Sequence, residues 1–484
     1  MNTRILLLFL LGLCSCTTEP VASEADDELT VVADTAARID DYLQWMSDSA
    51  GFTGSVLLAV DGEIVIRKGY GSANDSLGLP VDPNTIFTIG SITKQFTGAA
   101  ILKLEEMGEL SVEDPINKFF TDVPTDKRDI TIHQLLTHSA GFPGAIGDDA
   151  DPVGTGDFLA QAMNTELLFE PGSAYEYSNV GYSLLGILVE QLSGQSYEAF
   201  LQKHFFEPAG MTQTGYVLPD WSGETLAQGY RRGQHWGTLL DRPWREDGPG
   251  WHLRANGGIL STPMDMYRWH RALLGEEVLS EKSKEKYYGK HVEEGQGAGT
   301  YYGYGWAIFP TPRGTDLITH NGGNGIFFAD MYRYLEEDVF LFFATNRGSR
   351  DVEEIPYNTL RMVFQPEFEP SMTSEPDGQI FEGYPDGPAG ERLEAMVGLL
   401  QRGSDDALKS LVEEFMAPGM QEMAPMDEHL NVLRQMSERF GSLELRSTLN
   451  RGREFELIFA DEEGNPIPLL IALNPEGQIV GLNR

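Results

Sequence analysis

The chain has 484 residues, of which 41% are hydrophobic and 23% charged, a composition typical of globular proteins and unlike that of a disordered chain. This length exceeds what one hydrophobic core usually organises, so we expect a large domain and a smaller one. Acidic residues outnumber basic residues by 74 to 35, and the formal charge of −39 repels phosphate backbones, which argues against nucleic acid as a partner.

A short apolar segment follows the start of the chain. Residues 5–13 are apolar behind the single positive charge of Arg4, which fits a secretory signal peptide and is too short to span a bilayer comfortably. The next residues resemble the lipobox of bacterial lipoproteins, and Cys16 fits lipidation better than Cys14 because a small residue precedes it. We therefore expect a lipoprotein-type signal peptide over residues 1–16. Ordinary secretory cleavage that discards both cysteines is the alternative.

The segment 17–36 is polar and acidic, which predicts a tether between a membrane and the first domain. The expected location is thus outside the cytoplasm, in the periplasm, with the lipid anchor as the sole contact with a bacterial membrane. Cys14 and Cys16 are the only cysteines of the chain, so the mature protein cannot contain an internal disulfide framework.

The first domain, expected over residues 37–365, opens with a predicted β-hairpin. Between residues 55 and 70, two apolar runs flank Asp61 and Gly62, a pair typical of two-residue turns. After Gly90 the apolar residues recur with helical period, which places Ser91 in the first turn of a helix. Further helices are expected over residues 131–137 and 182–192, and strands over 304–309, 326–334 and 339–345. This order predicts a sheet built from distant parts of the chain, with a helical insertion between them.

The composition changes near residue 366, where proline, glycine and acidic residues become frequent. We expect a linker over residues 366–388 and a second, small α+β domain over residues 389–484. In that domain the pattern predicts helices over 393–400, 407–416 and 432–440, followed by alternating strands. Helices followed by an antiparallel sheet resemble the NTF2-like modules attached to some serine hydrolases.

Ser91 and Lys94 place a hydroxyl and an amine three residues apart on one helical face. A serine becomes nucleophilic beside a base, and a lysine can serve when burial and the helix dipole lower its pKa. The spacing alone is weak evidence, because Ser283 and Lys286 share it in a lysine-rich stretch. Ser91 could otherwise only cap a helix.

Tyr177 and Asn179 form the only Tyr-x-Asn of the chain, in an expected loop before a helix. Residues two apart in an extended segment point the same way, so the phenol and the amide can enter one cleft. Beside a lysine ammonium a phenolate is favoured, and it can act as a general base and later as an acid. A buried tyrosine followed by a turn-forming asparagine is the structural alternative.

The third candidate motif is His320-Asn321-Gly322-Gly323, which follows a short apolar run and is expected on or beside a strand. Glycines allow a substrate backbone to approach the strand, and the Gly323 N–H could complete an oxyanion hole with that of Ser91. His235 also begins a His-x-Gly sequence, but it lacks the apolar strand. His320 is therefore the preferred candidate.

The three motifs, in this order and at these separations, resemble those of the serine β-lactamase and penicillin-binding-protein superfamily, nearest its class C, carboxypeptidase and esterase branch. The resemblance covers residues 55–346. It includes the segments Phe-Thr-Ile-Gly (87–90), Leu-Leu-Thr-His-Ser-Ala-Gly-Phe (135–142), Glu-Pro-Gly (170–172) and Gly-Gly-Ile-Leu-Ser-Thr (257–262). It implies an α/β (α+β) β-lactamase-like fold, in which an antiparallel sheet flanked by helices adjoins an all-helical subdomain.

The resemblance also implies the roles of the site residues. Ser91 would be the acylated nucleophile, Lys94 its activating partner, Tyr177 the proton shuttle and Asn179 a substrate-orienting amide. His320 and Gly322 would contact the substrate. His320 stands where many β-lactamases carry lysine, so efficient β-lactam hydrolysis is in doubt, and esters or peptides containing D-amino acids are at least as plausible.

The leading hypothesis is a serine hydrolase that acts through an acyl-enzyme on a small-molecule or peptide substrate carrying an amide or ester, without metal or cofactor. The chain has no Gly-x-Ser-x-Gly elbow and no phosphate-binding P-loop. A non-catalytic or sensor protein that keeps the cleft for ligand binding is the alternative. The motifs do not identify the substrate, and the oligomeric state is not predicted.

Overall fold

The computed structural model describes residues 24–483 apart from 232, 296, 349–351, 373–378, 423–424, 451–453, 462–463, 465 and 475–476. The expected signal peptide and the lipidation candidate Cys16 lie outside the described residues. The chain divides into two compact units, Met1–Pro370 and Ser371–Arg484. The division falls inside the segment expected as a linker, and the strand β15 (Gln379–Glu382) lies in that segment as well.

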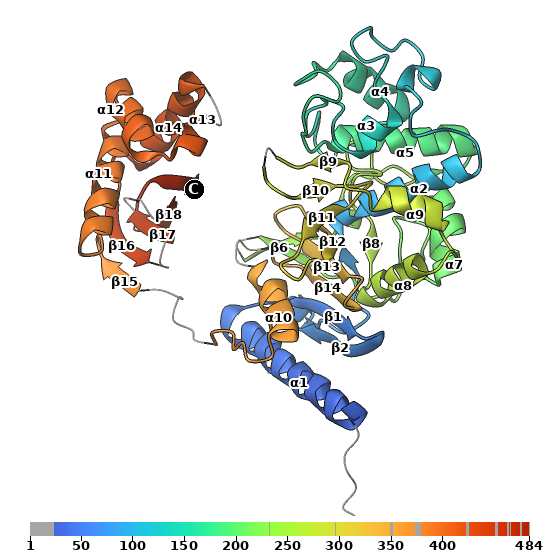
Figure 1. The fold of residues 1–484 in the computed structure, drawn as a ribbon, viewed down its shortest axis with the longest axis horizontal. Helices are drawn as coiled ribbons and strands as arrows, with labels where there is room; N and C mark the ends of the chain where they lie inside the picture. Colours follow the sequence, from blue (N-terminus) through green and yellow to red (C-terminus); the bar gives the residue numbers. More distant parts are fainter. Residues whose placement is uncertain are drawn as a thin grey trace, which may run out of the picture. The chain divides into compact units, whose positions relative to one another are not determined.

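An eight-stranded antiparallel sheet forms the centre of the first unit, in the order β2-β1-β14-β13-β12-β11-β10-β9 (Figure 1). Its strands are β1 (Gly54–Val60), β2 (Glu63–Tyr70), β9 (Val292–Glu293), β10 (Tyr301–Tyr302), β11 (Ala307–Pro310), β12 (Asp316–Gly323), β13 (Phe328–Tyr334) and β14 (Val339–Thr345). The predicted hairpin is confirmed, because β1 pairs with β2 across Asp61 and Gly62, both at positive φ. The sheet joins distant parts of the chain, since β1 also pairs with β14.

Helices cover both faces of this sheet. The helices of the first unit are α1 (Glu24–Ala50), α2 (Thr93–Glu106), α3 (Ile132–Leu136), α4 (Thr155–Asn164), α5 (Asn179–Ser193), α6 (Tyr197–Leu201), α7 (Glu207–Ala209), α8 (Pro263–Leu274), α9 (Glu281–Tyr287) and α10 (Glu354–Phe364). Alternate residues of β1 face opposite sides: Val56 packs in the core with α1 and α10, whereas Leu57 packs with α2 and α8. α3, α4 and α5 gather at one end of the unit (Figure 1).

Short paired strands hold the segments around the sheet. They are β3 (Ser72–Asn74) with β4 (Leu79–Pro80), β5 (Phe87–Thr88) with β8 (Leu260–Ser261), and β6 (Gly229–Arg231) with β7 (Gln234–Gly237). The β5–β8 pair fixes the chain just before residue 91, because the Ile89 N–H also donates to the Ile259 carbonyl.

Two segments differ from the expected local structure. Residues 24–36, expected in the tether, are helical and belong to α1, so the tether stays a prediction. The strand expected over residues 304–309 is shorter and covers Ala307–Pro310, because Gly305 takes a φ of 89° that interrupts extended backbone.

The second unit has its own sheet and core. Its sheet runs in the order β15-β16-β17-β18-β19, with β16 (Glu444–Asn450), β17 (Glu454–Ala460), β18 (Pro466–Leu473) and β19 (Ile479–Asn483). Its helices are α11 (Pro388–Arg402), α12 (Asp405–Ser410), α13 (Pro418–Glu422) and α14 (Met426–Phe440). As the alternation predicted, Phe455, Leu457 and Phe459 share the buried face of β17 and form one core with Leu393 and Leu433. The resemblance to NTF2-like modules stays a prediction.

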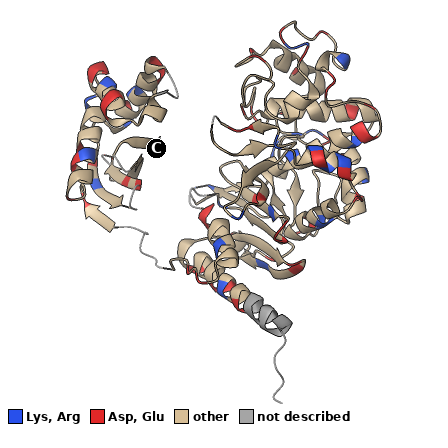
Figure 2. Cartoon of the chain, in the orientation of Figure 1, with Lys and Arg blue, Asp and Glu red and all other residues tan. Residues whose placement is uncertain are grey.

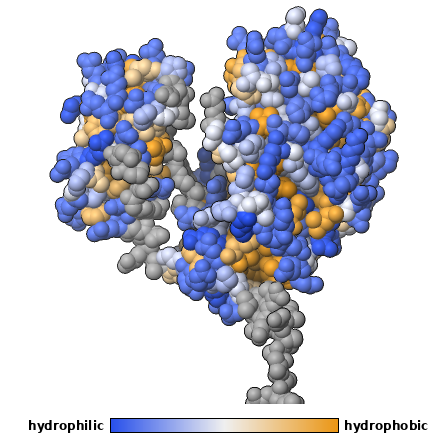
Figure 3. All heavy atoms as spheres, in the orientation of Figure 1, coloured by the Kyte–Doolittle hydropathy of each residue, from blue (hydrophilic) through white to orange (hydrophobic). Residues whose placement is uncertain are grey.

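Acidic residues are spread over both units rather than gathered in one place (Figure 2). On the face shown in Figure 3, hydrophilic side chains cover most of the first unit. No helix in the described part of the chain is both long and apolar enough to cross a membrane.

Candidate active site

Ser91 lies in a 3₁₀ turn, η1 (Gly90–Ile92), that leads directly into α2. The expectation that it occupies the first helical turn is thus correct to within two residues. Gly90 has a φ of 51° and lies against β12, so a Cβ atom there would come within 2.8 Å of the Gly323 nitrogen. Only glycine allows this turn and this close approach, which together bring Ser91 up against the sheet.

Lys94 is fully buried one turn after the serine. Its Nζ lies 3.2 Å from Ser91 Oγ, 2.7 Å from Asn179 Oδ1 and 2.7 Å from the Asn256 carbonyl oxygen. A neutral amine has two N–H donors and one lone pair. The two shorter contacts can take both donors, and the lone pair is then left for the serine hydroxyl.

The protonation of Lys94 follows from this environment. Burial lowers the pKa of the amine well below its usual range, and the nearby Asp149 carboxylate partly opposes that shift. No carboxylate forms an ion pair with Lys94 among the described residues, since its oxygen partners are an amide, a backbone carbonyl and a hydroxyl. The site therefore favours a lysine that can accept the serine proton.

Tyr177 and Asn179 reach the same amine from the segment that begins α5. The Ser178 hydroxyl accepts from the Gly181 N–H as the helix cap, and Asn179 is the first helical residue. The centre of the Tyr177 ring lies 4.7 Å from Lys94 Nζ. The motif expected in a loop thus straddles a helix start. Asn179 lines the cavity of Ser91 and Tyr177 lines a neighbouring cavity, so the amide and the phenol meet at Lys94 and not in one shared cleft.

The Tyr177 phenol differs from the expectation that its phenolate would be favoured. Burial raises its pKa above the ordinary value, and the adjacent Ser91 hydroxyl only partly offsets this rise. The phenol oxygen is buried beside Ser91, without standard hydrogen-bond geometry to any described group. A neutral phenol next to a neutral amine suits Tyr177 to donate a proton, which is the acid half of the role that the sequence suggested.

Strand β12 presents its glycines to Ser91. A Cβ on Gly322 would lie 2.4 Å from the Ser91 nitrogen and 2.2 Å from the Ile89 carbonyl oxygen. Gly323 follows at the end of the strand, and both glycines line the same cavity as Ser91. The backbone N–H groups of Ser91 and Gly323 thus belong to adjoining segments at the cavity wall, as an oxyanion hole requires.

His320 is placed differently from the substrate-contacting residue that the resemblance implied. Its ring is buried, Nε2 lies 2.9 Å from the Tyr302 hydroxyl, and Nδ1 lies 2.6 Å from the Asn321 carbonyl oxygen. Burial, together with the nearby Lys94, lowers the pKa of His320 to about 3, so the imidazole is uncharged at neutral pH. It lines a neighbouring cavity with Tyr177 and not the cavity of Ser91.

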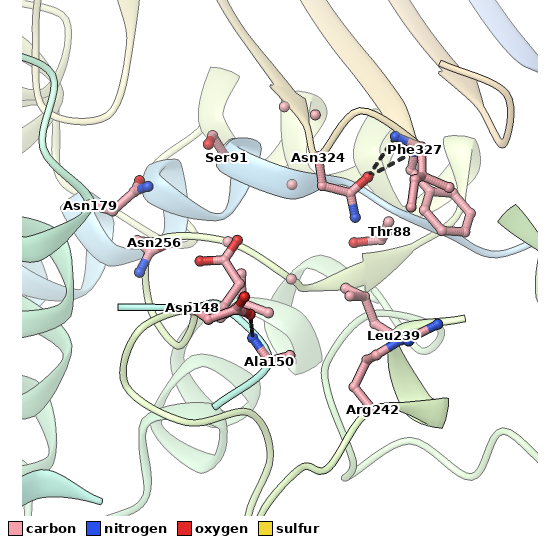
Figure 4. A pocket seen from close by; sticks show the side chains of 18 of the residues that line it. Thr88, Ser91, Asp148, Ala150, Asn179, Leu239, Arg242, Asn256, Asn324 and Phe327 are labelled. Atoms are coloured by element: carbon pink, nitrogen blue, oxygen red, sulfur yellow. Dashed lines mark hydrogen bonds between the residues drawn. The ribbon is translucent and has the colours of Figure 1, made fainter. Parts of the chain in front are cut away.

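The cavity beside Ser91 has a volume of about 260 Å³. Its lining includes Ser91, Asn179, the two glycines of β12, the acidic pair Asp148 and Asp149, and an aromatic and apolar wall of Trp236, Leu239, Trp244, Leu253 and Phe327. Figure 4 shows Ser91 and Asn179 at one end of this cavity and Arg242 at the other. A substrate bound at Ser91 can therefore extend past an apolar wall toward a cation.

Sequence reasoning missed several residues that support the site. The carbonyl of Asn256 holds Lys94, and the side-chain amide of the same residue donates to Ser183 Oγ and the His252 carbonyl. His138 Nδ1 accepts from the Ser178 N–H, and its ring centre lies 4.3 Å from that of Tyr177. Asn256 precedes one segment of the family resemblance and His138 lies inside another, yet no local pattern reveals a carbonyl or an imidazole in a supporting role.

In the described part of the chain, no group of three or more histidine, cysteine or acidic residues is arranged to hold a metal ion.

The fold and the grouped motifs define a class of proteins built on a β-lactamase-type catalytic unit. The model of the beta-lactamase family matches residues 39–363, and the chain belongs to this family. The family is of the serine hydrolase type, as the resemblance of the three motifs predicted.

Particular relatives agree with this assignment. The chain is similar to penicillin-binding protein 4* of Bacillus subtilis, with 30% identity over 325 residues that cover 63% of this chain and 71% of that protein. It is also similar to the protein flp of Staphylococcus aureus, with 31% identity over 206 residues that cover 41% of each chain.

Solved structures extend the comparison. The penicillin-binding protein of Bacillus halodurans is 27% identical, with a TM-score of 0.56 over 66% of this chain and 97% of its own. The octameric penicillin-binding protein homologue of Pyrococcus abyssi is 23% identical, with a TM-score of 0.61 over 92% of this chain and 94% of its own. The second likeness concerns the fold alone, and it extends beyond the residues matched by the family model.

Proposed function

We propose that the protein is a serine hydrolase that cleaves an amide or ester through an acyl-enzyme on Ser91. The observation that carries this proposal is the buried Lys94 amine, which lies 3.2 Å from the Ser91 hydroxyl and has its two shorter contacts with carbonyl-type oxygens. A serine that merely capped the helix would need no such partner.

Acylation follows from these contacts. Lys94 accepts the proton of Ser91 Oγ while that oxygen bonds to the substrate carbonyl carbon. The developing oxyanion is stabilised by the N–H groups of Ser91 and Gly323. Tyr177 donates its proton to the departing amine or alcohol as the scissile bond breaks, and it regains a proton from Lys94.

Deacylation reverses the proton path. A water molecule takes the place of the leaving group and loses a proton to the Tyr177 and Lys94 pair as its oxygen bonds to the acyl carbon. The Ser91 Oγ–carbon bond then breaks, and the proton returns to Ser91. The 2.7 Å contact between Asn179 Oδ1 and Lys94 Nζ holds the amine in place, so that its lone pair stays directed at Ser91.

We further propose that the substrate is a small molecule or peptide met outside the cytoplasm. Support comes from the apolar segment 5–13 and the lipobox-like sequence ending at Cys16. Labelling of the full-length protein with a fatty-acid analogue tests this location. Incorporation that disappears in Cys16→Ser supports the anchor, and equal incorporation in both proteins contradicts it.

The catalytic proposal is tested by intact mass spectrometry of the protein and its Ser91→Ala variant. Both are incubated with a penicillin, a cephalosporin, a D-alanyl dipeptide and short-chain nitrophenyl esters, and product release is followed in parallel. We expect an adduct or turnover that is lost in Ser91→Ala, and the responding compound assigns the substrate class. A folded protein that shows neither across the panel contradicts the proposal and favours a binding protein.

A further inference from the structure

Two arginines line the cavity of Ser91. Arg242 follows the short strand β7, and Arg231 ends β6. In Figure 4, Arg242 lies at the opposite end of the cavity from Ser91, with Leu239 close to it. The cavity therefore carries positive charge at a distance from the nucleophile.

The guanidinium of Arg242 is held in place, and among the described residues no carboxylate forms an ion pair with it. Its carbon lies 3.7 Å from the centre of the Trp236 ring, and one terminal nitrogen donates to the Trp236 carbonyl. Its Nε is buried without a hydrogen-bond partner among the described groups. Nearby arginines are different, since Arg245 pairs with Asp247 and Arg347 pairs with Asp75.

The charges in the cavity are arranged asymmetrically. Asp148 and Asp149 line it as well, and Asp149 is near enough to Lys94 for each to affect the pKa of the other. A negative group of a ligand would be repelled at that end and attracted at the arginine end. Between the ends, Thr88 is buried with its hydroxyl unpartnered in the described part of the chain, and it lines the same cavity (Figure 4).

The position where many β-lactamases carry a lysine supplies no cation here. His320 faces a different cavity and bonds to Tyr302. Any carboxylate on the substrate must therefore be neutralised elsewhere, and a guanidinium stacked on an indole is well suited to hold one, because its planar donors match two carboxylate oxygens.

We propose that Arg242, assisted by Arg231, binds a carboxylate of the substrate at the end of the cavity remote from Ser91. This inference rests on the proposed function and narrows its substrate class to amides or esters with an apolar segment between the scissile carbonyl and the carboxylate. Trp236, Leu239 and Phe327 contact that segment.

The test uses matched esters. Mono-4-nitrophenyl esters of straight-chain dicarboxylic acids with six to ten carbons carry a carboxylate remote from the scissile bond, and 4-nitrophenyl esters of monocarboxylic acids of equal length lack it. We expect the wild-type protein to hydrolyse a charged ester with kcat/KM about tenfold above its neutral counterpart at one or more lengths. We expect Arg242→Gln to abolish this preference, because its kcat/KM for the charged ester falls about tenfold more than its kcat/KM for the neutral ester.

Two further variants make the result specific. Arg242→Lys keeps the charge without the planar fork, and we expect it to retain part of the preference. Arg245→Gln removes an arginine from the same loop that does not line the cavity, and we expect the full preference to remain. Equal rates on both esters in the wild-type protein, or an equal loss on both in Arg242→Gln, would overturn the inference.

A binding measurement separates this inference from the proposed function. Ser91→Ala is titrated calorimetrically with the same ester pair, with and without Arg242→Gln, so no turnover is needed. Stronger binding of the charged ester that depends on Arg242 supports the carboxylate site even if the wild-type protein forms no acyl-enzyme. Hydrolysis of neutral esters without any Arg242-dependent preference keeps the proposed function and rejects the carboxylate site.

Discussion

Lys94 shows how burial favours the neutral form of a common residue. Its amine lies in a fully buried position where water cannot solvate an ammonium, and its oxygen partners match the two donors of the neutral form. The same contacts that stabilise the neutral amine also direct its lone pair at Ser91.

A first prediction concerns the removal of this base. We expect Lys94→Met to lower the acylation rate by about 10²–10⁴-fold, because general-base assistance is lost while Ser91 remains. Lys103→Met, in the same helix and paired with Glu106 near the surface, should keep the wild-type rate. Both are measured by adduct formation with an ester. An unchanged rate in Lys94→Met would mean that another group accepts the serine proton.

The lowered pKa of Lys94 predicts the pH dependence of the same step. The amine must be unprotonated to act, so we expect the acylation rate to rise with pH through the lowered pKa and to level off well below pH 10. A rate that continued to rise toward the ordinary lysine pKa would contradict the role of burial. Unfolding at high pH is monitored by circular dichroism as the control.

His270, a buried histidine outside the site, is expected to make the folded protein less stable in acid. Burial, together with Arg333 and Arg271, lowers the pKa of His270 to about 2. The unfolded state binds a proton below about pH 6.5 and the folded state does not, so stability falls as pH decreases below that value. At pH 5 the loss from this residue is about 2 kcal/mol relative to pH 7.5. Urea unfolding at pH 7.5 and pH 5 measures this loss. We expect the fall in the free energy of unfolding between the two pH values to be smaller by that amount in His270→Gln. An equal fall in both proteins would contradict the lowered pKa of His270.

At the residue scale, sequence reasoning predicted which candidate residues lie together and the lowered pKa of Lys94, but not the protonation of its neighbours. The motif order predicted that Ser91, Lys94, Tyr177 and Asn179 meet, and the structure places them in contact. The neutral states of Tyr177 and His320 could not be predicted, because they depend on burial by residues far away in the chain. Arg242 lies in a segment without any motif, so no local pattern indicated it.

Among the elements, the contact of β12 with η1 determines the geometry of the nucleophile. Two glycines permit it, one at position 90 in the turn and one at position 322 in the strand. Any side chain at these positions would push the strand and the turn apart, and with them the two N–H groups proposed for the oxyanion hole.

We therefore expect Gly322→Ala to lower the acylation rate about tenfold or more and to destabilise the first unit by about 1–3 kcal/mol, since its Cβ would lie 2.4 Å from the Ser91 nitrogen. Gly156→Ala is the control. This glycine lies in α4 with nothing within 4 Å of an added Cβ, so activity should be unchanged and stability within about 1 kcal/mol. Full activity in Gly322→Ala would show that the close approach is not required.

Elements with strong periodicity were predictable, and irregular ones were not. The β1–β2 hairpin, β14 and the helix that follows Tyr177 agree with the sequence pattern, because each has a regular apolar face. The start of α1 was missed because the acidic residues at positions 24, 26, 27 and 28 made this part of the chain resemble a polar tether. The end strands β9 and β10 have two residues each, too few for a period to be recognised.

At the scale of the whole molecule, the two units have separate cores, centred on residues such as Leu188 in the first and Leu457 in the second. We expect two calorimetric transitions. Leu457→Ala should lower the temperature of only one transition and leave ester hydrolysis unchanged. Leu188→Ala should lower the temperature of only the other. Each change should reduce the free energy of unfolding of its own unit by about 2–5 kcal/mol. A single transition shifted by either change would show that the units unfold together.

The pairing of β1 with β14 affects how the chain can fold while it is being synthesised. Gly54 lies opposite Thr345, so about 290 further residues must be synthesised after β1 before its partner strand β14 is complete. The central sheet of the first unit therefore cannot be completed until nearly all of that unit has left the ribosome. Until then β1 has only β2 as a sheet neighbour, so the other edge of this hairpin stays unpaired during synthesis.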